Sequence, residues 1–157
     1  MPLWEIFHSM DAFTGPLDAT WLAGNITKLY TAQELPAFYV NVLFFPMQAG
    51  SYFVGGAPAN RLSGYSGGPV ARDKPYVRIS IQHIAIHYNE DQDKVNAMLE
   101  RIDNVLRAHI EEKGYDWEYN VLEPDRAKWE INGIKPPQHP SNEEKKWFND
   151  GKPSHWQ

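Results

Sequence analysis

The chain has 157 residues, a formal net charge of −5, an aromatic content of 13% and no cysteine. A chain of this length usually forms one domain and buries roughly 68–70% of its unfolded surface. The acidic balance argues against a nucleic-acid partner, which would need a basic face, and the lack of cysteine excludes disulfides and thiolate chemistry. No apolar run approaches the roughly 20 residues that span a bilayer, and the N-terminus lacks the features of a signal peptide. The sequence therefore predicts a soluble cytoplasmic protein with no nucleic-acid or membrane partner.

The first predicted strand, MPLWEIFH (1–8), is notable for Pro2. A methionine followed by a small residue such as proline is normally removed, which would leave Pro2 as the amino terminus. A terminal proline is a secondary amine with a pKa near the ordinary α-amino value of about 7.7–8.0, and burial in an apolar wall lowers that pKa. Since general acid–base catalysis favours a base poised near neutral pH, Pro2 is a candidate catalytic residue. Alternatively, Pro2 only opens a strand, where proline is tolerated.

A helix and a second strand follow. Pro16 suits the first turn of a helix, and apolar residues then recur at helical spacing up to Leu29 and Tyr30. YVNVLFF (39–45) predicts a strand, and its near-continuous apolar character suits a sheet buried on both faces. Together with SYFVGG (51–56), a short strand or hairpin arm, these segments form a first β-α-β unit over residues 1–56, with a right-handed parallel crossover. The Gly- and Pro-rich stretch after it predicts a loop.

The same order recurs in the second half of the chain. YVRISIQHIAI (76–86) alternates apolar and polar residues and predicts a strand. Residues 90–110 carry the most regular amphipathic helix pattern, which ends before Gly114. WEYNVL (117–122) predicts a fourth main strand, so residues 76–122 form a second β-α-β unit. The residue identities of the two units barely match, and the repeat is one of architecture only.

The tail, 123–157, combines many prolines with four large aromatics. Disordered segments are poor in aromatics, so we predict an extended arm that lies on a surface such as that of a neighbouring subunit. The whole chain, 1–157, is then a single domain.

The Met-Pro start, the two β-α-β units and the segment DWEYNVLEPDRAKWEINGIKPP (116–137) together resemble the tautomerase superfamily. Within it, the match is to the group of cis-3-chloroacrylic acid dehalogenase and its fungal relatives. SYFVGG (51–56) and EEKKWF (143–148) extend the resemblance over almost the whole chain. It implies an α/β (α+β) fold with helices on one face of the sheet. It also implies a homotrimer with a barrel-like core, and catalysis by the amino-terminal proline without a cofactor.

The resemblance also implies roles for particular residues. Pro2 matches the catalytic proline, Tyr119 aligns with a tyrosine of the fourth strand, and Glu130 aligns with a glutamate that helps to activate water. Tyr30 stands where the family has a histidine near the end of the first helix, and a phenol can still donate a hydrogen bond. From the residues alone, Tyr119 could equally be a core tyrosine and Glu130 a solvated charge.

The largest departure from the family lies at the end of the third strand. The family has an arginine after a His-Ile-Ala-like sequence, where it holds the substrate carboxylate, but this chain has Ile86. Isoleucine cannot replace a bidentate guanidinium. We therefore expect Ile86 and Trp4 to line an apolar pocket beside Pro2, and His87 to recognise a neutral or phenolic group. Arg72, Arg78 and Arg126 are possible stand-ins without positional support.

Metal chemistry is not expected. His83 and His87 are four residues apart, which on one strand separates them by about 13 Å, whereas a zinc site needs three or four convergent ligands. The sequence thus predicts a cofactor-independent isomerase in which Pro2 acts as acid and base on an enolisable small molecule other than a simple carboxylate. Two alternatives stay open: a hydratase- or dehalogenase-like lyase that adds water with Tyr119 and Glu130, and a small-molecule-binding protein without activity.

Overall fold

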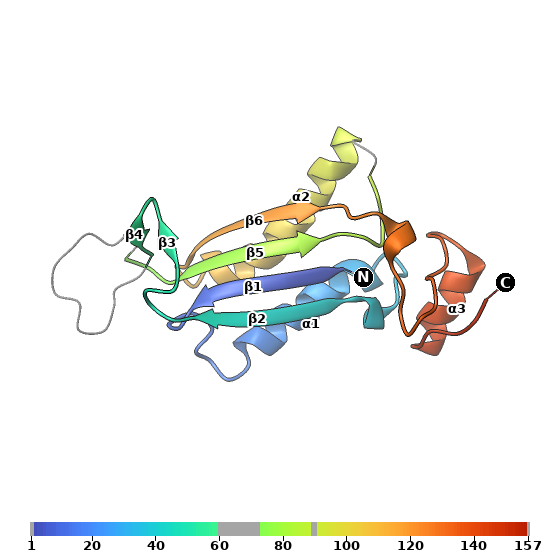
Figure 1. The fold of residues 1–157 in the computed structure, drawn as a ribbon, viewed down its shortest axis with the longest axis horizontal. Helices are drawn as coiled ribbons and strands as arrows, with labels where there is room; N and C mark the ends of the chain where they lie inside the picture. The colour runs from blue at the N-terminus through green and yellow to red at the C-terminus, as the bar shows by residue number, and fades with distance from the viewer. Residues whose placement is uncertain (1, 60–72, 89–90, 157) are drawn as a thin grey trace.

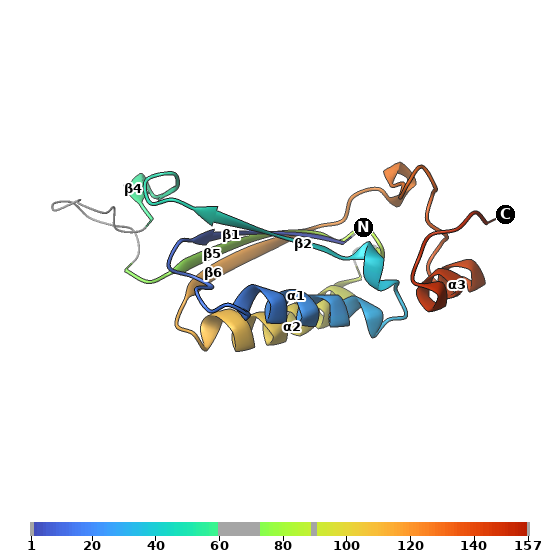
Figure 2. The ribbon, with the colours of Figure 1, turned by 90° about the horizontal axis from the view of Figure 1, so that it is seen from below.

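The computed structural model describes residues 2–59, 73–88 and 91–156. Its centre is a four-stranded sheet with two long helices on one face, as Figures 1 and 2 show. The strands of this sheet are β1 (Leu3–Ser9), β2 (Asn41–Met47), β5 (Tyr76–Gln82) and β6 (Asp116–Leu122). The helices on its face are α1 (Asp18–Thr31) and α2 (Gln92–Leu106), the latter extended by a π-helical turn at Arg107–Glu111. The remaining elements are β3 (Phe53–Val54), β4 (Ala57–Pro58), α3 (Asn142–Asp150) and short 3-10 helices at Ala37–Tyr39 and Arg126–Lys128.

The strand order β2-β1-β5-β6 confirms the two predicted β-α-β units. β1 pairs with β2 in parallel, and β5 pairs with β6 in parallel. The two units meet through the antiparallel pair β1 and β5, in which Leu3 lies opposite Gln82. As a result, the start of β1 lies at the same end of the sheet as the start of β2 and the ends of β5 and β6.

The core lies between the sheet and the two helices. Trp4, Ile6 and Ile79 alternate with outward-facing residues on the strands and are completely buried, as the period of two in a strand requires. The opposite face of the sheet keeps large apolar side chains in solvent: Leu43 is 43% exposed, and Leu122 is 53% exposed. The prediction that β2 is buried on both faces is therefore wrong for a single chain, because the helices cover only one face.

Two predicted strand boundaries shift. The second strand begins at Asn41, because Tyr39 belongs to the preceding 3-10 helix. The third strand ends at Gln82 instead of residue 86. The His83 N–H still donates to the Leu122 carbonyl (2.6 Å), but β6 has no further residue to continue the ladder. Residues 83–88 are consequently a loop, and the expectation that His83 and His87 share one strand is wrong.

The predicted hairpin arm at 51–56 is present. β3 and β4 pair in antiparallel around Gly55 and Gly56, whose φ angles are 59° and 82°. Positive φ at both central residues is the requirement of a type I′ turn, which glycine meets without strain. In the described parts of the chain, no helix is long and apolar enough to cross a membrane.

The prediction that the C-terminal arm is extended is wrong for Asn142–Asp150, which form a helix, whereas its contact with a neighbouring subunit stays a prediction. The arm contains helix α3 and packs on its own chain, at the end of the sheet where β1 begins (Figure 1). The Trp129 ring lies 4.8 Å from the Tyr39 ring, and Trp147 is buried beside the same tyrosine. The missed signal is Ser141-x-x-Glu144, a helix N-terminal pattern, in which the Ser141 hydroxyl accepts from the Glu144 N–H (3.1 Å).

A buried ion pair fastens this arm. The carboxylate of Glu144, 2% exposed, pairs with Arg126 (3.1 Å) and lies 2.6 Å from Nδ1 of His139. The Arg126 guanidinium also donates to the carbonyls of Ala85 and Pro137. Arg126 therefore connects the loop after β5 with Glu144 of α3 and with the segment that precedes α3 at Pro137.

We predict that Glu144→Gln lowers the free energy of unfolding by about 3 kcal/mol, because removing one partner of a buried pair leaves the other charge uncompensated. Urea denaturation followed by tryptophan fluorescence measures this difference. Glu143→Gln is the matched control, since Glu143 is the exposed neighbour on the same helix, and it should change the free energy of unfolding by less than about 0.5 kcal/mol. Equal effects of the two substitutions would contradict the role given to the ion pair.

Candidate active site

Pro2 is buried and directly precedes β1. Its carbonyl accepts from the Asn41 N–H of β2 (2.9 Å). On the other side, the pair Leu3 and Gln82 is the last of the β1–β5 ladder, and the register extended by one residue places Pro2 opposite His83. Directly opposed residues of an antiparallel pair have Cβ atoms about 4.5–5.5 Å apart. Pro2 thus lies between two other strands, on the side of the sheet that faces the helices.

Trp4, Tyr30 and His83 form a buried chain of polar contacts beside Pro2. The Trp4 indole N–H donates to the Tyr30 hydroxyl (3.0 Å), which lies 3.4 Å from Nδ1 of His83. The imidazole stacks on the Tyr88 ring, with centroids 5.3 Å apart and planes 8° apart. Arg101 of α2 donates to the Tyr88 hydroxyl (3.3 Å). The predicted site residues Trp4 and Tyr30 are thereby brought together near Pro2, whereas the sequence analysis missed the contribution of His83.

The groups of this chain are uncharged at neutral pH. Burial lowers the pKa of His83 to about 4, and the nearby His87 and Arg101 act in the same direction. Burial likewise raises the pKa of Tyr30 and that of Tyr88. A small cavity of about 20 Å³ lies against Tyr30, His83 and Tyr88, which is about the size that one water molecule needs.

Several buried polar atoms near this end of the sheet have no hydrogen-bond partner among the described residues. They are the Tyr39 hydroxyl, Nε2 of His83, Nε2 of His87, Nε of Arg126 and Nε1 of Trp129. Leaving such a group unpaired costs about 1–3 kcal/mol, so clusters of them mark places where a ligand or water completes the bonding. All five belong to segments that follow β5 and β6 or precede β2, and therefore lie toward the end of the sheet where β1 begins.

Ile86 and His87 lie in the loop that follows β5. Ile86 is half-buried and packs against the hydrophobic core. His87 is half-buried and keeps its unpaired Nε2 inside the protein. The loop carbonyl of Ala85 binds the Arg126 guanidinium. Of the three possible stand-in arginines, Arg126 therefore lies beside this loop. Both of its terminal nitrogens already donate hydrogen bonds, to backbone carbonyls and to Glu144.

Arg78 does not reach Pro2 within one chain. It lies opposite Phe7 in the β1–β5 register, five residues along β1 from Pro2, or about 17 Å. Its guanidinium pairs with Glu118 (3.5 Å) and donates to Asn120 (2.5 Å), on the sheet face away from the helices. Arg72 lies outside the described residues.

Tyr119 and Glu130 also lie apart from Pro2 in the single chain. Tyr119 shares a row of the sheet with Ile79 and Ile6, about 13 Å along the strands from Pro2. Its hydroxyl donates to Asp103 of α2 (2.7 Å), and burial together with this carboxylate raises the pKa of the phenol. Glu130 is exposed, next to the buried Trp129.

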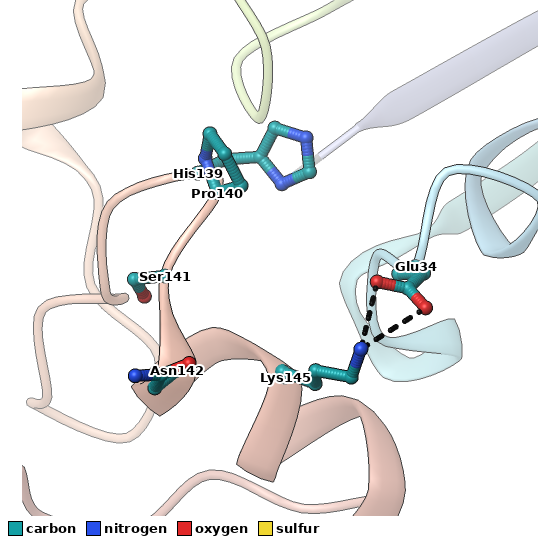
Figure 3. A pocket seen from close by; sticks show the side chains of 6 residues that line it. All are labelled: Glu34, His139, Pro140, Ser141, Asn142 and Lys145. Carbon is teal, nitrogen blue, oxygen red and sulfur yellow. Dashed lines mark hydrogen bonds and ion pairs between the residues drawn. The ribbon is translucent and has the colours of Figure 1, made fainter.

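Two larger surface pockets do not include Pro2. One, of about 420 Å³, lies between the start of α3 and Glu34, where Lys145 pairs with Glu34 at 3.4 Å (Figure 3). The other, of about 290 Å³, lies near the β3–β4 hairpin at the opposite end of β1. No group of three His, Asp or Glu side chains suited to a metal ion is found in the described ranges.

Comparisons with known proteins identify relatives over nearly the full length of the chain. The family model "Tautomerase_3: Putative oxalocrotonate tautomerase enzyme" matches residues 1–152. A probable enzyme from the thermophilic fungus Aspergillus fumigatus is 38% identical, with a TM-score of 0.81 over 99% of this chain and 98% of that one. Native RhCC from Rhodococcus jostii RHA1 is 32% identical, with a TM-score of 0.82 over 98% of this chain and 99% of that one.

A more distant likeness concerns the fold alone. A fused 4-OT, solved as an asymmetric trimer, is 13% identical, with a TM-score of 0.58 over 85% of this chain and 94% of that one. The comparison with curated proteins finds no match.

The lowered pKa of His83 predicts a pH-dependent stability. An ordinary histidine titrates near 6.5 and His83 near 4, so the unfolded chain binds the extra proton between these values and the folded protein loses stability as the pH falls from 6.5 towards 4. Between pH 7.5 and pH 5 the loss from this group is about 2 kcal/mol. Urea denaturation at the two pH values measures it.

His83→Asn should remove this part of the pH dependence. His155→Asn is the control, because His155 is exposed, and it should leave the difference between pH 7.5 and pH 5 unchanged. An unchanged difference in the His83 variant would contradict a buried neutral imidazole.

Proposed function

Because the chain belongs to the Tautomerase_3 family, we propose that it is a cofactor-independent tautomerase or isomerase in which Pro2, as the mature amino terminus, carries the proton. The family match and the fold support this class of activity. The observation that carries the proposal is the place of Pro2: a buried proline at the inner end of β1, beside the polar chain Trp4, Tyr30 and His83.

The buried environment of Pro2 favours an amine that acts as a base at neutral pH. Burial disfavours the charged ammonium and lowers the pKa of an amine. A nearby cation has the same effect, and Arg101 lies close enough to His83 to lower the pKa of that imidazole. An unprotonated secondary amine takes a proton from the carbon next to a carbonyl group, and an enol or enolate forms. The resulting ammonium returns the proton to another atom of the same molecule, so the net reaction is an isomerisation.

We propose an uncharged or weakly acidic carbonyl compound as the substrate. Ile86 offers no charge to a carboxylate, the terminal nitrogens of Arg126 are already bound, and Arg101 donates to the Tyr88 hydroxyl. Unpaired atoms on segments at this end of the sheet include the indole N–H of Trp129 and Nε2 of the neutral His83, which are hydrogen-bonding groups without charge. Neutral groups suit a carbonyl or phenolic oxygen better than a carboxylate.

The alternative of a water-adding lyase has less support. That reaction would require Tyr119 and Glu130 at the same site as Pro2, yet in one chain the Tyr119 hydroxyl binds Asp103 and Glu130 faces solvent. Only a neighbouring subunit could bring them to the substrate. A binding protein without activity is distinguished from an enzyme by the measurements below.

We also propose that the protein assembles as a homotrimer. The sheet face away from the helices presents Leu43, Phe45 and Leu122, which are 43%, 36% and 53% exposed. Burial of apolar surface is worth about 25 cal/mol per Å², so this face favours association with further copies of the chain. The fused 4-OT with the same fold was solved as a trimer.

Blocking the amine tests the role of Pro2. A variant with one alanine inserted between Met1 and Pro2 turns the Pro2 nitrogen into an amide, and we expect a loss of at least about 10²-fold in kcat, the usual contribution of a general acid or base. The probe is deuterium exchange at the benzylic carbon of phenylacetone in D2O, followed by proton NMR. Intact-mass measurement establishes the mature terminus of each protein, and sedimentation checks that the extended variant keeps its assembly. Full activity in the extended variant would rule out the proline mechanism.

A pair of ketones tests the substrate class. Phenylacetone and phenylpyruvate differ at one substituent, a methyl group or a carboxylate, and we expect the protein to exchange phenylacetone more efficiently. Ile86→Arg should shift the ratio of kcat/KM values towards phenylpyruvate by about 10- to 100-fold, because a hydrogen bond to a charged group is worth about 1.5–3 kcal/mol. Gln138→Arg, at an exposed position of the arm, is the control for added charge. A preference of the unmodified protein for phenylpyruvate would overturn the proposal of an uncharged substrate.

A further inference from the structure

His83 is a buried imidazole to which the proposed proline chemistry assigns no task. It is 3% exposed, it lies opposite Pro2 by the extended β1–β5 register, and its Nε2 has no partner among the described residues. A buried polar atom of this kind costs stability unless something completes it. Its position next to Pro2 suggests that the missing partner is the substrate.

The hydrogen-bond chain accommodates a proton on Nε2 of His83. The indole of Trp4 can only donate, so the Tyr30 oxygen accepts from it at 3.0 Å. The single hydroxyl proton of Tyr30 is then free to point towards Nδ1 of His83, 3.4 Å away. With Nδ1 as the acceptor, a neutral imidazole must carry its proton on Nε2.

The surroundings hold this imidazole in one orientation. The Tyr88 ring stacks on it almost in parallel, and Arg101 in turn binds the Tyr88 hydroxyl. The backbone N–H of His83 donates to the Leu122 carbonyl. The ring plane and the backbone position of His83 are thus held by contacts to α2, to β6 and to the loop itself.

We propose that His83 is a catalytic residue whose Nε2–H donates a hydrogen bond to the carbonyl oxygen of an aldehyde or ketone substrate. This inference rests on the proposed function of Pro2. When the Pro2 amine takes the proton from the neighbouring carbon, the electron pair of the broken C–H bond forms a C=C bond and the carbonyl oxygen gains negative charge. His83 stabilises that oxygen and keeps its own proton, and the Pro2 ammonium later returns the proton to the substrate.

A neutral donor is matched to a neutral substrate. A donor aimed at a developing oxyanion in a site without water is worth about 10²–10³-fold in kcat, and a neutral imidazole has the same charge before and after the step. His83 would thereby contribute charge stabilisation in the transition state, whereas an arginine would also bind the ground state of a carboxylate. An uncharged donor at His83 and an apolar side chain at Ile86 together suit a substrate with a carbonyl oxygen and an acidic C–H bond.

Two substitutions at His83 distinguish a role of its Nε2–H as hydrogen-bond donor from a role of the side chain in packing. His83→Gln places an amide N–H near the position of Nε2, whereas His83→Asn reaches only the position of Nδ1 and can keep the contact to Tyr30. With phenylacetone exchange as the assay, we expect kcat to fall about 10²-fold in His83→Asn and to stay within about tenfold of the unmodified protein in His83→Gln. Equal rates in the Asn variant and the unmodified protein would overturn the inference, as would equal losses in the two variants.

The tautomer is measured without turnover. In protein with 15N-labelled histidine, NMR at pH 7 should show His83 with a protonated Nε2 and an unprotonated Nδ1, and Tyr30→Phe should weaken this preference. A proton on Nδ1 overturns the inference whatever the activity. If the alanine-extended protein is inactive but His83→Asn is fully active, the role of His83 is ruled out and the role of Pro2 is kept. If the alanine-extended protein is fully active, the proline mechanism falls.

Discussion

The position of the first strand is the constraint on which the site depends. β1 has a parallel neighbour in β2 and an antiparallel neighbour in β5, so its first residue lies between the start of one strand and the end of another. The hydrogen bond from Asn41 to the Pro2 carbonyl closes one side, and the loop from His83 onward closes the other. Residues near a chain end are usually mobile, whereas Pro2 is buried and hydrogen-bonded to β2.

Charge is distributed unequally over the molecule. Arg78 and Glu118 lie on the open face of the sheet, and the Arg126–Glu144 pair is fully used in fastening the arm. The residues next to Pro2 are apolar or kept neutral by burial, apart from Arg101, which binds the Tyr88 hydroxyl and lowers the pKa of His83. The charged pairs on the open face and in the arm stabilise the structure. Under the proposed mechanism, the Pro2 amine is the base and uncharged donors face the substrate.

The sequence predicted the fold well and the site in part. The alternation in β5 and the amphipathic pattern of α2 each follow from one face of an element being buried, and that information is local. The pairing of Tyr30 with His83 is not local, because 53 residues separate them and only the antiparallel meeting of the two units brings them together. The same holds for the arm: its aromatic residues were evident, but their contact with Tyr39 depends on where the strand ends. Tyr119 is placed in the site only by the resemblance, and in one chain the register places it against α2, so its role stays a prediction.

The central claim is that Pro2 is a free amine with a lowered pKa. In protein labelled with 15N-proline, the 12 prolines comprise tertiary amides, which do not titrate, and at most one secondary amine. We predict one 15N resonance that moves with pH, with a midpoint below the ordinary α-amino value of about 7.7–8.0. The absence of any titrating proline, or a midpoint above that value, would contradict the account.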